Sequence, residues 1–291
     1  MFHEIISNPN YFTLLLFLIS ILGGLLGAIL GLGGGIIIVP TLTLLFGIDI
    51  RYAIGASIVS VIATSSGAAA AYVRDRMANI RVAMFLEIAT TAGAITGALL
   101  AAQLASKYLF LLFSIILIYS ALSMFRKRKL EGARHPHQVK SDPLSKTLRL
   151  SSSYPDASLG REVVYSVGGV KLGFVLMYAA GVMSALLGIG SGVLKVPAMD
   201  GAMGLPIKVS TATSNFMIGV TAAASAGAYY MRGDILPMIA APVALGVFFG
   251  SWVGIRLLTK LPARSIRSLF IFVLVIVAVQ MGLKGLKSGA H

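Results

Sequence analysis

Residues 31–40 of the chain read Gly-Leu-Gly-Gly-Gly-Ile-Ile-Ile-Val-Pro and interrupt a long apolar region with a cluster of glycines. In hydrocarbon each unpaired N–H or C=O group costs several kcal/mol, so non-helical backbone is tolerated there only where protein or a cavity surrounds it. The pattern returns in residues 188–197, Gly-Ile-Gly-Ser-Gly-Val-Leu-Lys-Val-Pro, with three glycines and the proline matched at a constant offset. Two such breaks predict a site inside the protein.

The composition indicates a membrane protein. Of the 291 residues 57% are hydrophobic and 12% are charged, and several apolar runs are long enough to span a bilayer, which is typical of a polytopic membrane protein. The net charge is +14, and the basic residues lie in connecting segments and at helix ends, as expected for loops that face anionic lipid. Nucleic-acid binding is therefore not indicated. The chain has no cysteine, which excludes disulfides and thiolate metal sites.

The hydrophobic runs follow one plan in each half of the chain. The first repeat, residues 1–125, contains long runs at 11–30, 52–73, 82–104 and 108–125, and a short apolar piece at 36–46. The second repeat, residues 166–291, contains long runs at 170–187, 209–231, 235–258 and 266–283, and a short piece at 193–203. Each short piece is about 16 Å long, roughly half of a hydrocarbon core. The sequence predicts an all-α polytopic membrane protein of two homologous repeats with four or five hydrophobic segments each.

Further residue pairs match at the same offset, namely Gly47 with Gly204, Arg51 with Lys208, Ser57 with Ser214 and Tyr72 with Tyr229. If the short pieces only dip into the membrane, there are eight spans and the halves are parallel. If they complete a crossing, there are ten segments and the halves are inverted. The absence of basic residues before Tyr11 places the N-terminus outside and favours the inverted scheme, in which glycine-broken half-helices meet near the midplane.

The segment between the repeats, residues 126–165, carries more Lys and Arg than any other connection. It is predicted to be a solvated, partly disordered linker on the cytoplasmic side.

These residues carry a resemblance that covers nearly the whole chain. The chain resembles the TauE/SafE family of membrane permeases, also described as sulfite exporter-like, in the glycine element ending at Pro40, in its echo ending at Pro197 and in the two-repeat layout. The resemblance implies a secondary transporter in the cell (inner) membrane that exports small organosulfur or sulfur oxyanions, such as sulfite or sulfoacetate. Import of a different small organic anion, or a role as a membrane scaffold or assembly factor, remains as an alternative.

Backbone amides and helix dipoles at the two breaks would favour an anion, and nearby hydroxyl and amide groups can donate to sulfonate oxygens. The alternative is that the glycines permit tight helix crossing and that the hydroxyls only join helices. The predicted substrate-binding residues are Gly33, Gly34, Gly35, Ser57, Gly190, Ser191, Gly192, Lys195, Ser214 and Asn215.

Lys195 is the most informative single residue, because a charge in an apolar half-helix is costly and usually faces a cavity or a partner. The sequence leaves three roles open for Lys195: contact with the anion, an ion pair with Asp200, or extension of its side chain to the membrane interface. Asp200 and Glu87 are the candidates for coupling to a proton or a sodium ion. Asp200 could instead be the counter-ion of Lys195, and Glu87 an interfacial group near Arg81 or Arg76.

The inventory of reactive groups does not indicate an enzyme. The four histidines lie at the termini or in the linker, and the predicted spans contain no His cluster or carboxylate pair that could hold a metal or run acid–base chemistry. No metal site and no cofactor are predicted. The sequence leaves open whether the chain forms a homodimer.

Overall fold

The computed structural model describes residues 9–30, 33–101, 103–131, 141–156, 159–188 and 192–287. The first half contains α2 (Pro9–Leu30), α3 (Gly35–Pro40), the π-helical turn η1 (Thr41–Leu45), α4 (Ile50–Arg74), α5 (Ile80–Ala101) and α6 (Ser106–Glu131). The second half contains α8 (Val170–Leu187), α9 (Gly192–Gly201), α10 (Ile207–Met231), α11 (Pro237–Lys260) and α12 (Ala263–Lys287). Between them lie α7 (Pro143–Thr147), β1 (Ser152–Asp156) and β2 (Arg161–Tyr165).

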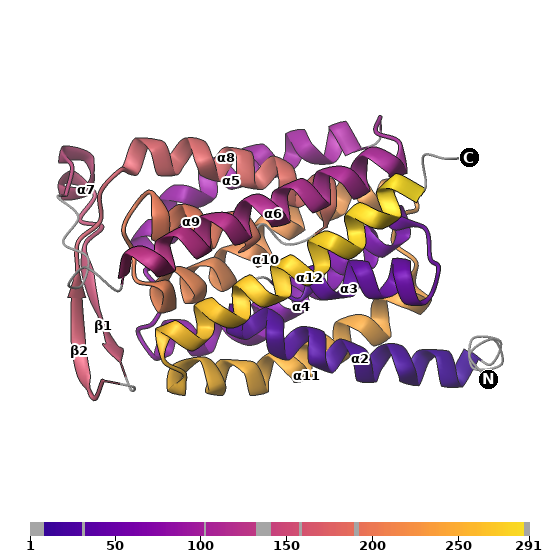
Figure 1. The fold of residues 1–291 in the computed structure, drawn as a ribbon, viewed down its shortest axis with the longest axis horizontal. Helices are drawn as coiled ribbons and strands as arrows, with labels where there is room; N and C mark the ends of the chain where they lie inside the picture. Colours follow the sequence, from indigo (N-terminus) through magenta and orange to yellow (C-terminus); the bar gives the residue numbers. More distant parts are fainter. Residues whose placement is uncertain are drawn as a thin grey trace.

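The helices form one bundle with a two-stranded hairpin at one end (Figure 1). Among the described residues, five helices are long and apolar enough to cross a membrane, at Tyr11–Leu30, Ile50–Arg74, Ile80–Ala101, Val170–Leu187 and Pro237–Leu257. The predicted class, an all-α polytopic membrane protein, is confirmed.

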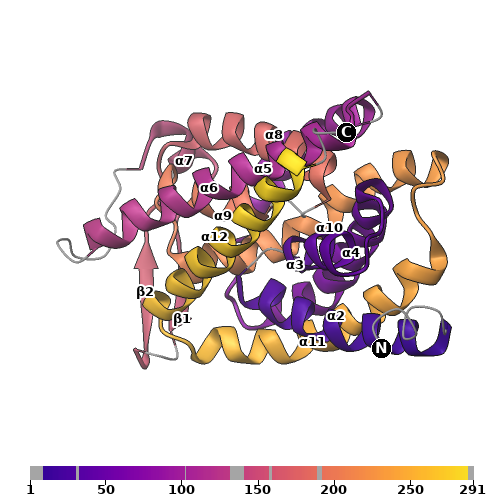
Figure 2. The ribbon, with the colours of Figure 1, turned by 45° about the vertical axis from the view of Figure 1, so that its right-hand side comes forward.

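Glycines allow two pairs of helices, α2 with α11 and α5 with α8, to pack with their backbones in contact. A Cβ atom at Gly246 or Gly250 of α11 would collide with carbonyl groups of α2. A Cβ atom at Gly93 or Gly97 of α5 would likewise collide with the backbone of α8. In a bilayer, where helices gain little from burying apolar surface against each other, such close approach supplies the packing energy. Figures 1 and 2 both show α2 beside α11.

The two halves of the chain interlock. The helix α2 packs on α11, and its counterpart α8 packs on α5; α4 packs on α10, and α6 packs on α12. Two matched tyrosines make matched hydrogen bonds, since Tyr72 Oη donates to the carbonyl of Ala28 and Tyr229 Oη donates to the carbonyl of Ala185. Each of these long helices therefore packs against a helix of the other half, whereas the tyrosine bonds lie within each half.

The contacts at the bundle ends give the direction of the helices. At the hairpin end, Asn79 before α5 donates to the carbonyl of Leu150, and Lys208 at the start of α10 donates to Asp156 of β1. At the opposite end, Arg51 at the start of α4 donates to a carbonyl in the connection between α5 and α6. The helix α4 thus runs toward the hairpin, and α10 runs away from it. Figure 1 shows α2 beginning and α12 ending away from the hairpin.

The connection between the halves, predicted to be a solvated and partly disordered linker, is folded in residues 141–156 and 159–165. The strands β1 and β2 pair antiparallel, with Ser152 opposite Tyr165. Asp142 accepts hydrogen bonds from the backbone N–H groups of Ser145 and Val170, which fixes α7 against the start of α8. The helix α6 also extends past residue 125 to Glu131, because residues 126–131 favour helix. Residues 132–140 and 157–158 lie outside the described part.

A buried ion pair joins the hairpin to the bundle. Lys208 Nζ lies 2.6 Å from Asp156 Oδ1, and the two side chains are 1% and 5% exposed. Tyr154 Oη donates to the other oxygen of this carboxylate at 3.0 Å. Burial, together with the negative charge of Asp156, raises the pKa of Tyr154, so the phenol stays protonated as a donor. Charge counting alone could not detect this contact, because it depends on which face of the hairpin meets the bundle.

We expect Asp156→Ala to destabilise the protein by about 3–5 kcal/mol, because it leaves the Lys208 ammonium buried without its carboxylate. Asp75→Ala is the matched control, since Asp75 pairs with Arg74 at a site where the two side chains are 36% and 78% exposed. That change should cost less than about 1 kcal/mol. Thermal unfolding of the two purified variants measures the difference. Equal, small effects would show that the hairpin is not held by this pair.

Candidate functional site

The first glycine break lies between α2 and α3. Gly33 and Gly34 have φ angles of +71° and +79°, a conformation that side chains disfavour. Thr64 of α4 donates to the carbonyl of Gly33 at 3.1 Å, so the open backbone is satisfied inside the protein. Gly35 begins α3 and is buried, and Pro40 ends its regular helical bonding, after which the chain forms the π-helical turn η1.

The second break follows α8, where Gly188 has a φ of +65°. Ser57 of α4 donates to the Gly188 carbonyl. A Cβ atom at Gly188 would press on Ile54, one turn earlier in α4. Two of the predicted binding residues, Gly190 and Ser191, lie outside the described residues, and α9 begins at Gly192, which is buried.

Predicted residues on α4 and α10 therefore lie against the breaks. Asn215 of α10 is fully buried and its Nδ2 donates to the carbonyl of Ala28, near the end of α2. Ser214 is buried beside it on the same helix. In this conformation Ser57 and Asn215 hold backbone carbonyls, as the packing alternative expects.

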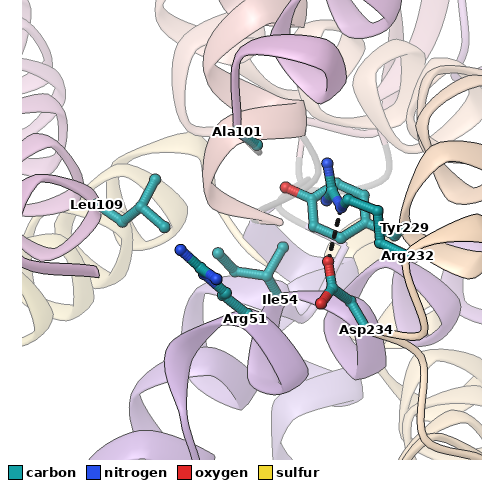
Figure 3. Close-up of a pocket in the computed structure, with 7 residues that line it drawn as sticks. All are labelled: Arg51, Ile54, Ala101, Leu109, Tyr229, Arg232 and Asp234. Atoms are coloured by element: carbon teal, nitrogen blue, oxygen red, sulfur yellow. Dashed lines mark hydrogen bonds and ion pairs between the residues drawn. The ribbon is translucent and has the colours of Figure 1, made fainter. Parts of the chain in front are cut away.

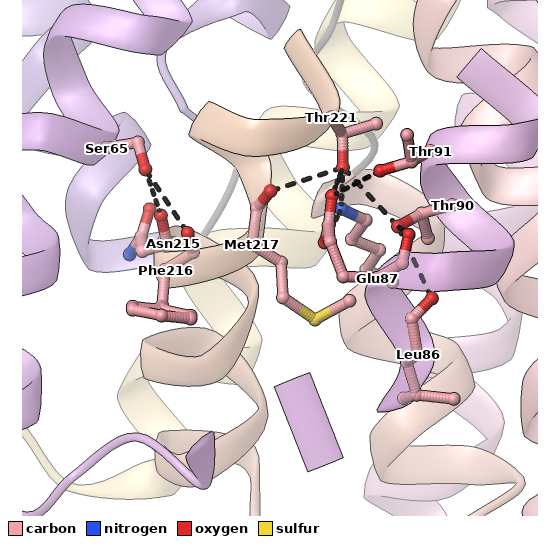
Figure 4. A network of polar contacts seen from close by, with 10 residues as sticks. Ser65, Leu86, Glu87, Thr90, Thr91, Asn215, Phe216, Met217 and Thr221 are labelled. Atoms are coloured by element: carbon pink, nitrogen blue, oxygen red, sulfur yellow. Dashed lines mark hydrogen bonds and ion pairs between the residues drawn. The ribbon is translucent and has the colours of Figure 1, made fainter. Parts of the chain in front are cut away.

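A buried polar network joins the two halves at mid-bundle (Figure 4). Lys195 of α9 is 0% exposed, and its Nζ donates to Thr221 Oγ1 of α10 at 2.6 Å. The same ammonium lies 3.7 Å from Glu87 Oε2 of α5. Thr221 in turn donates to Glu87 Oε1 at 2.6 Å, and Thr91 donates to that oxygen at 3.2 Å. One cation and one carboxylate are thus bridged by a hydroxyl.

This network corrects two interpretations of the sequence. The structure pairs Lys195 with Glu87 and not with Asp200, because residues five apart on a helix point about 140° away from each other. The structure also does not pair Arg81 with Glu87, the pairing that the interfacial interpretation expected. The Glu87 side chain is only 14% exposed, whereas Arg81 is exposed and donates to the carbonyl of Arg149 near the hairpin. Asp200 is buried in α9.

A cavity of about 200 Å³ opens at the end of the bundle away from the hairpin (Figure 3). Its lining residues are Arg51, Ile54, Ala101, Leu109, Tyr229, Arg232 and Asp234. Arg232 pairs with Asp234 at 2.8 Å, and its guanidinium lies 4.2 Å from the centre of the Tyr229 ring. Two guanidinium groups face one carboxylate, so the cavity is basic.

The cavity lies next to the second break. Ile54 lines the cavity and also lies against Gly188. Tyr229 lines it too and donates a hydrogen bond to the carbonyl of Ala185, near the end of α8. The sequence singles out Arg51 only as the match of Lys208, and it gives no signal for Arg232 beyond the position of that residue at the end of a span. Lys208, the match of Arg51, is buried under the hairpin instead.

In the part of the chain that the structure describes, no group of three His, Asp or Glu residues could hold a metal ion.

Comparisons with known proteins give a consistent result. The family described as Sulfite exporter TauE/SafE matches residues 16–281. The probable membrane transporter protein YunE of Bacillus subtilis is 26% identical over 281 residues, which cover 94% of this chain and 98% of that protein. A probable membrane transporter protein of Haemophilus influenzae is 27% identical over 295 residues, which cover 94% of this chain and 99% of that protein. No solved structure matches the chain significantly.

Two glycines separate the effect of backbone strain from that of crowding. Gly33 and Gly47 have similar φ angles, +71° and +68°, but a Cβ atom at Gly33 would lie 3.0 Å from Ile218 and 3.1 Å from Val61, whereas nothing lies within 4 Å at Gly47. We expect Gly47→Ala to cost about 1–2 kcal/mol and to retain transport. Gly33→Ala should cost more, and Gly33→Leu should abolish transport in protein that still inserts into the membrane.

Flux into proteoliposomes and thermal stability measure these effects. Near-normal flux in Gly33→Leu would leave the first break with a packing role only.

Proposed function

The chain belongs to the sulfite exporter TauE/SafE family, and on that premise we propose that it is a secondary carrier which exports small sulfur oxyanions or sulfonates across the cell membrane. A membrane transporter follows from the family and from relatives named as probable membrane transporters. The anion class and the direction are the proposal. The observation that carries it is Lys195, an ammonium group with no exposed surface inside a membrane bundle.

The surroundings of Lys195 suit a small oxyanion. A buried ammonium inside a membrane is expensive and usually marks a substrate or ion site. Thr221 places a hydroxyl group beside it and already donates to a carboxylate oxygen, and the Thr90 hydroxyl lies 3.5 Å from that of Thr221. A sulfite or sulfonate oxygen is also an anionic acceptor, so it can replace that oxygen with the same donors. Hydroxyl donors without fixed charge keep binding weak enough for release.

We further propose that the two halves are inverted repeats with the anion site at their interface. Three observations support this arrangement. The matched helices α2 and α8 each pack on a helix of the other half, α11 and α5 respectively. The helices α4 and α10 run in opposite directions, and Tyr72 and Tyr229 make corresponding hydrogen bonds. Sites of inverted-repeat carriers lie near the membrane midplane, beside broken helices. Here the first half contributes Glu87, and the second contributes Lys195 and Thr221.

The glycine breaks would flank this site. The described residues that we assign to them are Gly33, Gly34, Gly35 and Gly192, with Ser57, Ser214 and Asn215 from α4 and α10. Because Ser57 and Asn215 now hold carbonyl groups, they would meet the anion only after the breaks move.

The two ends of the bundle differ in a way that fits one state of a carrier. The cavity with Arg51 and Arg232 opens one end, whereas the hairpin and the Asp156–Lys208 pair cover the other. The basic charge of the linker favours a cytoplasmic position for the hairpin end, and the cavity would then face outside. Two guanidinium groups there would attract an anion and hold it briefly before release.

Thermal-shift screening of the purified protein tests the substrate class. Sulfite, thiosulfate, sulfoacetate and methanesulfonate should raise the melting temperature, since a ligand bound by the folded state stabilises it. Acetate, and uncharged molecules about the size of taurine, should leave the melting temperature unchanged. Labelled ligand should then move in proteoliposomes. Stabilisation by carboxylates alone would reassign the substrate, and the absence of both stabilisation and flux would favour a scaffold.

Lys195 and Glu87 together distinguish an anion site from a structural pair. We expect Lys195→Met to weaken binding of the stabilising anion by about 1.5–3 kcal/mol, the usual worth of a hydrogen bond to a charged group. Because this change leaves Glu87 buried without its cation, it should also lower stability. The double variant Lys195→Met/Glu87→Gln should recover stability without recovering affinity. Unchanged affinity in Lys195→Met would remove this lysine from the site.

A further inference from the structure

We propose that Glu87 carries the coupled proton: an anion that binds Lys195 displaces the Glu87 carboxylate, which then takes up one proton, so that anion and proton cross the membrane together. This inference rests on the proposed anion site at Lys195. It selects Glu87 over Asp200.

The carboxylate of Glu87 depends on one cation. Its Oε1 accepts hydrogen bonds from Thr221 and Thr91, whereas its Oε2 is buried and accepts no hydrogen bond within the described part of the chain. The charge that faces Oε2 is the Lys195 ammonium at 3.7 Å. The two groups meet at a distance longer than a direct hydrogen bond and share Thr221 as a bridge. The ammonium can therefore move to another acceptor without breaking a short ion-pair bond.

Other titratable groups on the helices around Glu87 lie elsewhere. On α9, Asp200 points about 140° away from Lys195. On α10, Lys208 and Tyr229 are about 20 Å and 12 Å along the axis from Thr221. On α8, Lys171 is exposed in the first turn, and Tyr178 is hydrogen-bonded to Thr96, two and a half turns beyond Glu87. On α5 itself, Arg81 is bonded to the carbonyl of Arg149.

Charge balance then decides the fate of the proton. In the present state Lys195 and Glu87 compensate each other. When a monovalent anion takes the ammonium, the site would hold two negative charges and one positive charge in a medium where uncompensated charge is costly. One proton on Glu87 restores neutrality. The Thr91 hydroxyl, 3.2 Å from Oε1, can turn to accept from the protonated carboxyl group.

The same balance works in reverse. When the anion leaves, Lys195 is again without a counter-ion, Glu87 releases its proton, and the resting pair re-forms. A carrier that changes sides only while its site is neutral would therefore couple one proton to each monovalent anion.

Proton uptake on binding tests this inference directly. The purified full-length protein is titrated with methanesulfonate, a monovalent anion that stays ionised near neutral pH, in two buffers of different ionisation enthalpy. Calorimetry then counts the protons bound with each anion. Sulfite is counted with its own protonation subtracted. We expect about one proton per anion for the wild-type protein and none for Glu87→Gln. Glu87→Asp, which keeps a carboxylate, should retain the uptake.

The outcomes separate this inference from the proposed function. Anion binding without proton uptake by the wild-type protein would overturn the role of Glu87 and leave the anion carrier standing. Uptake that persists in Glu87→Gln and disappears in Asp200→Asn would overturn it in favour of Asp200. If no sulfur anion binds, the proposed substrate class fails and this inference fails with it. Where Glu87→Gln does not fold, the wild-type count still tests whether a proton is taken up, and loss of that uptake in Asp200→Asn would overturn the choice of Glu87.

Discussion

Backbone that is not helical must find hydrogen-bond partners inside the protein when it lies within a membrane, and this constraint shapes the bundle. The chain breaks its helices at two glycine clusters and then supplies donors to the carbonyls around them. Thr64 holds the Gly33 carbonyl, Ser57 holds the Gly188 carbonyl, and Asn215 holds the carbonyl of Ala28. Two of these three contacts join one half of the chain to the other. The halves therefore interlock, and neither break is closed by its own half alone.

Buried charge obeys the same constraint and also joins distant segments. The ammonium of Lys195 is matched by Glu87 through Thr221, which connects α9, α10 and α5. The ammonium of Lys208 is matched by Asp156, which fastens the hairpin over one end of the bundle. At the other end Arg232 lies beside an open cavity. A central charged pair, one covered end and one open basic end together form the arrangement that a carrier needs in one of its two states.

The sequence by itself determined the membrane class, the positions of the long helices and of the glycine clusters, and the family resemblance. It also singled out Lys195 as a charge within an apolar segment. These features are local, because hydropathy, glycine spacing and the repeat offset are set by residues near one another in the chain. Even so, the boundary of α6 differed, since the helix propensity of residues 126–131 outweighed their charge.

Only the tertiary structure decided the partners. Lys195 pairs with Glu87 and not with nearby Asp200, because helical rotation turns Asp200 away and the packing of α5 and α9 around α10 brings Glu87 close. The linker folds because its strands and Asp156 dock on the bundle, which its composition did not reveal. Arg232 joins the basic cavity because α10 ends beside the start of α4. In each case the energy lies in contacts between residues far apart in the chain, and sequence spacing carries no information about such contacts.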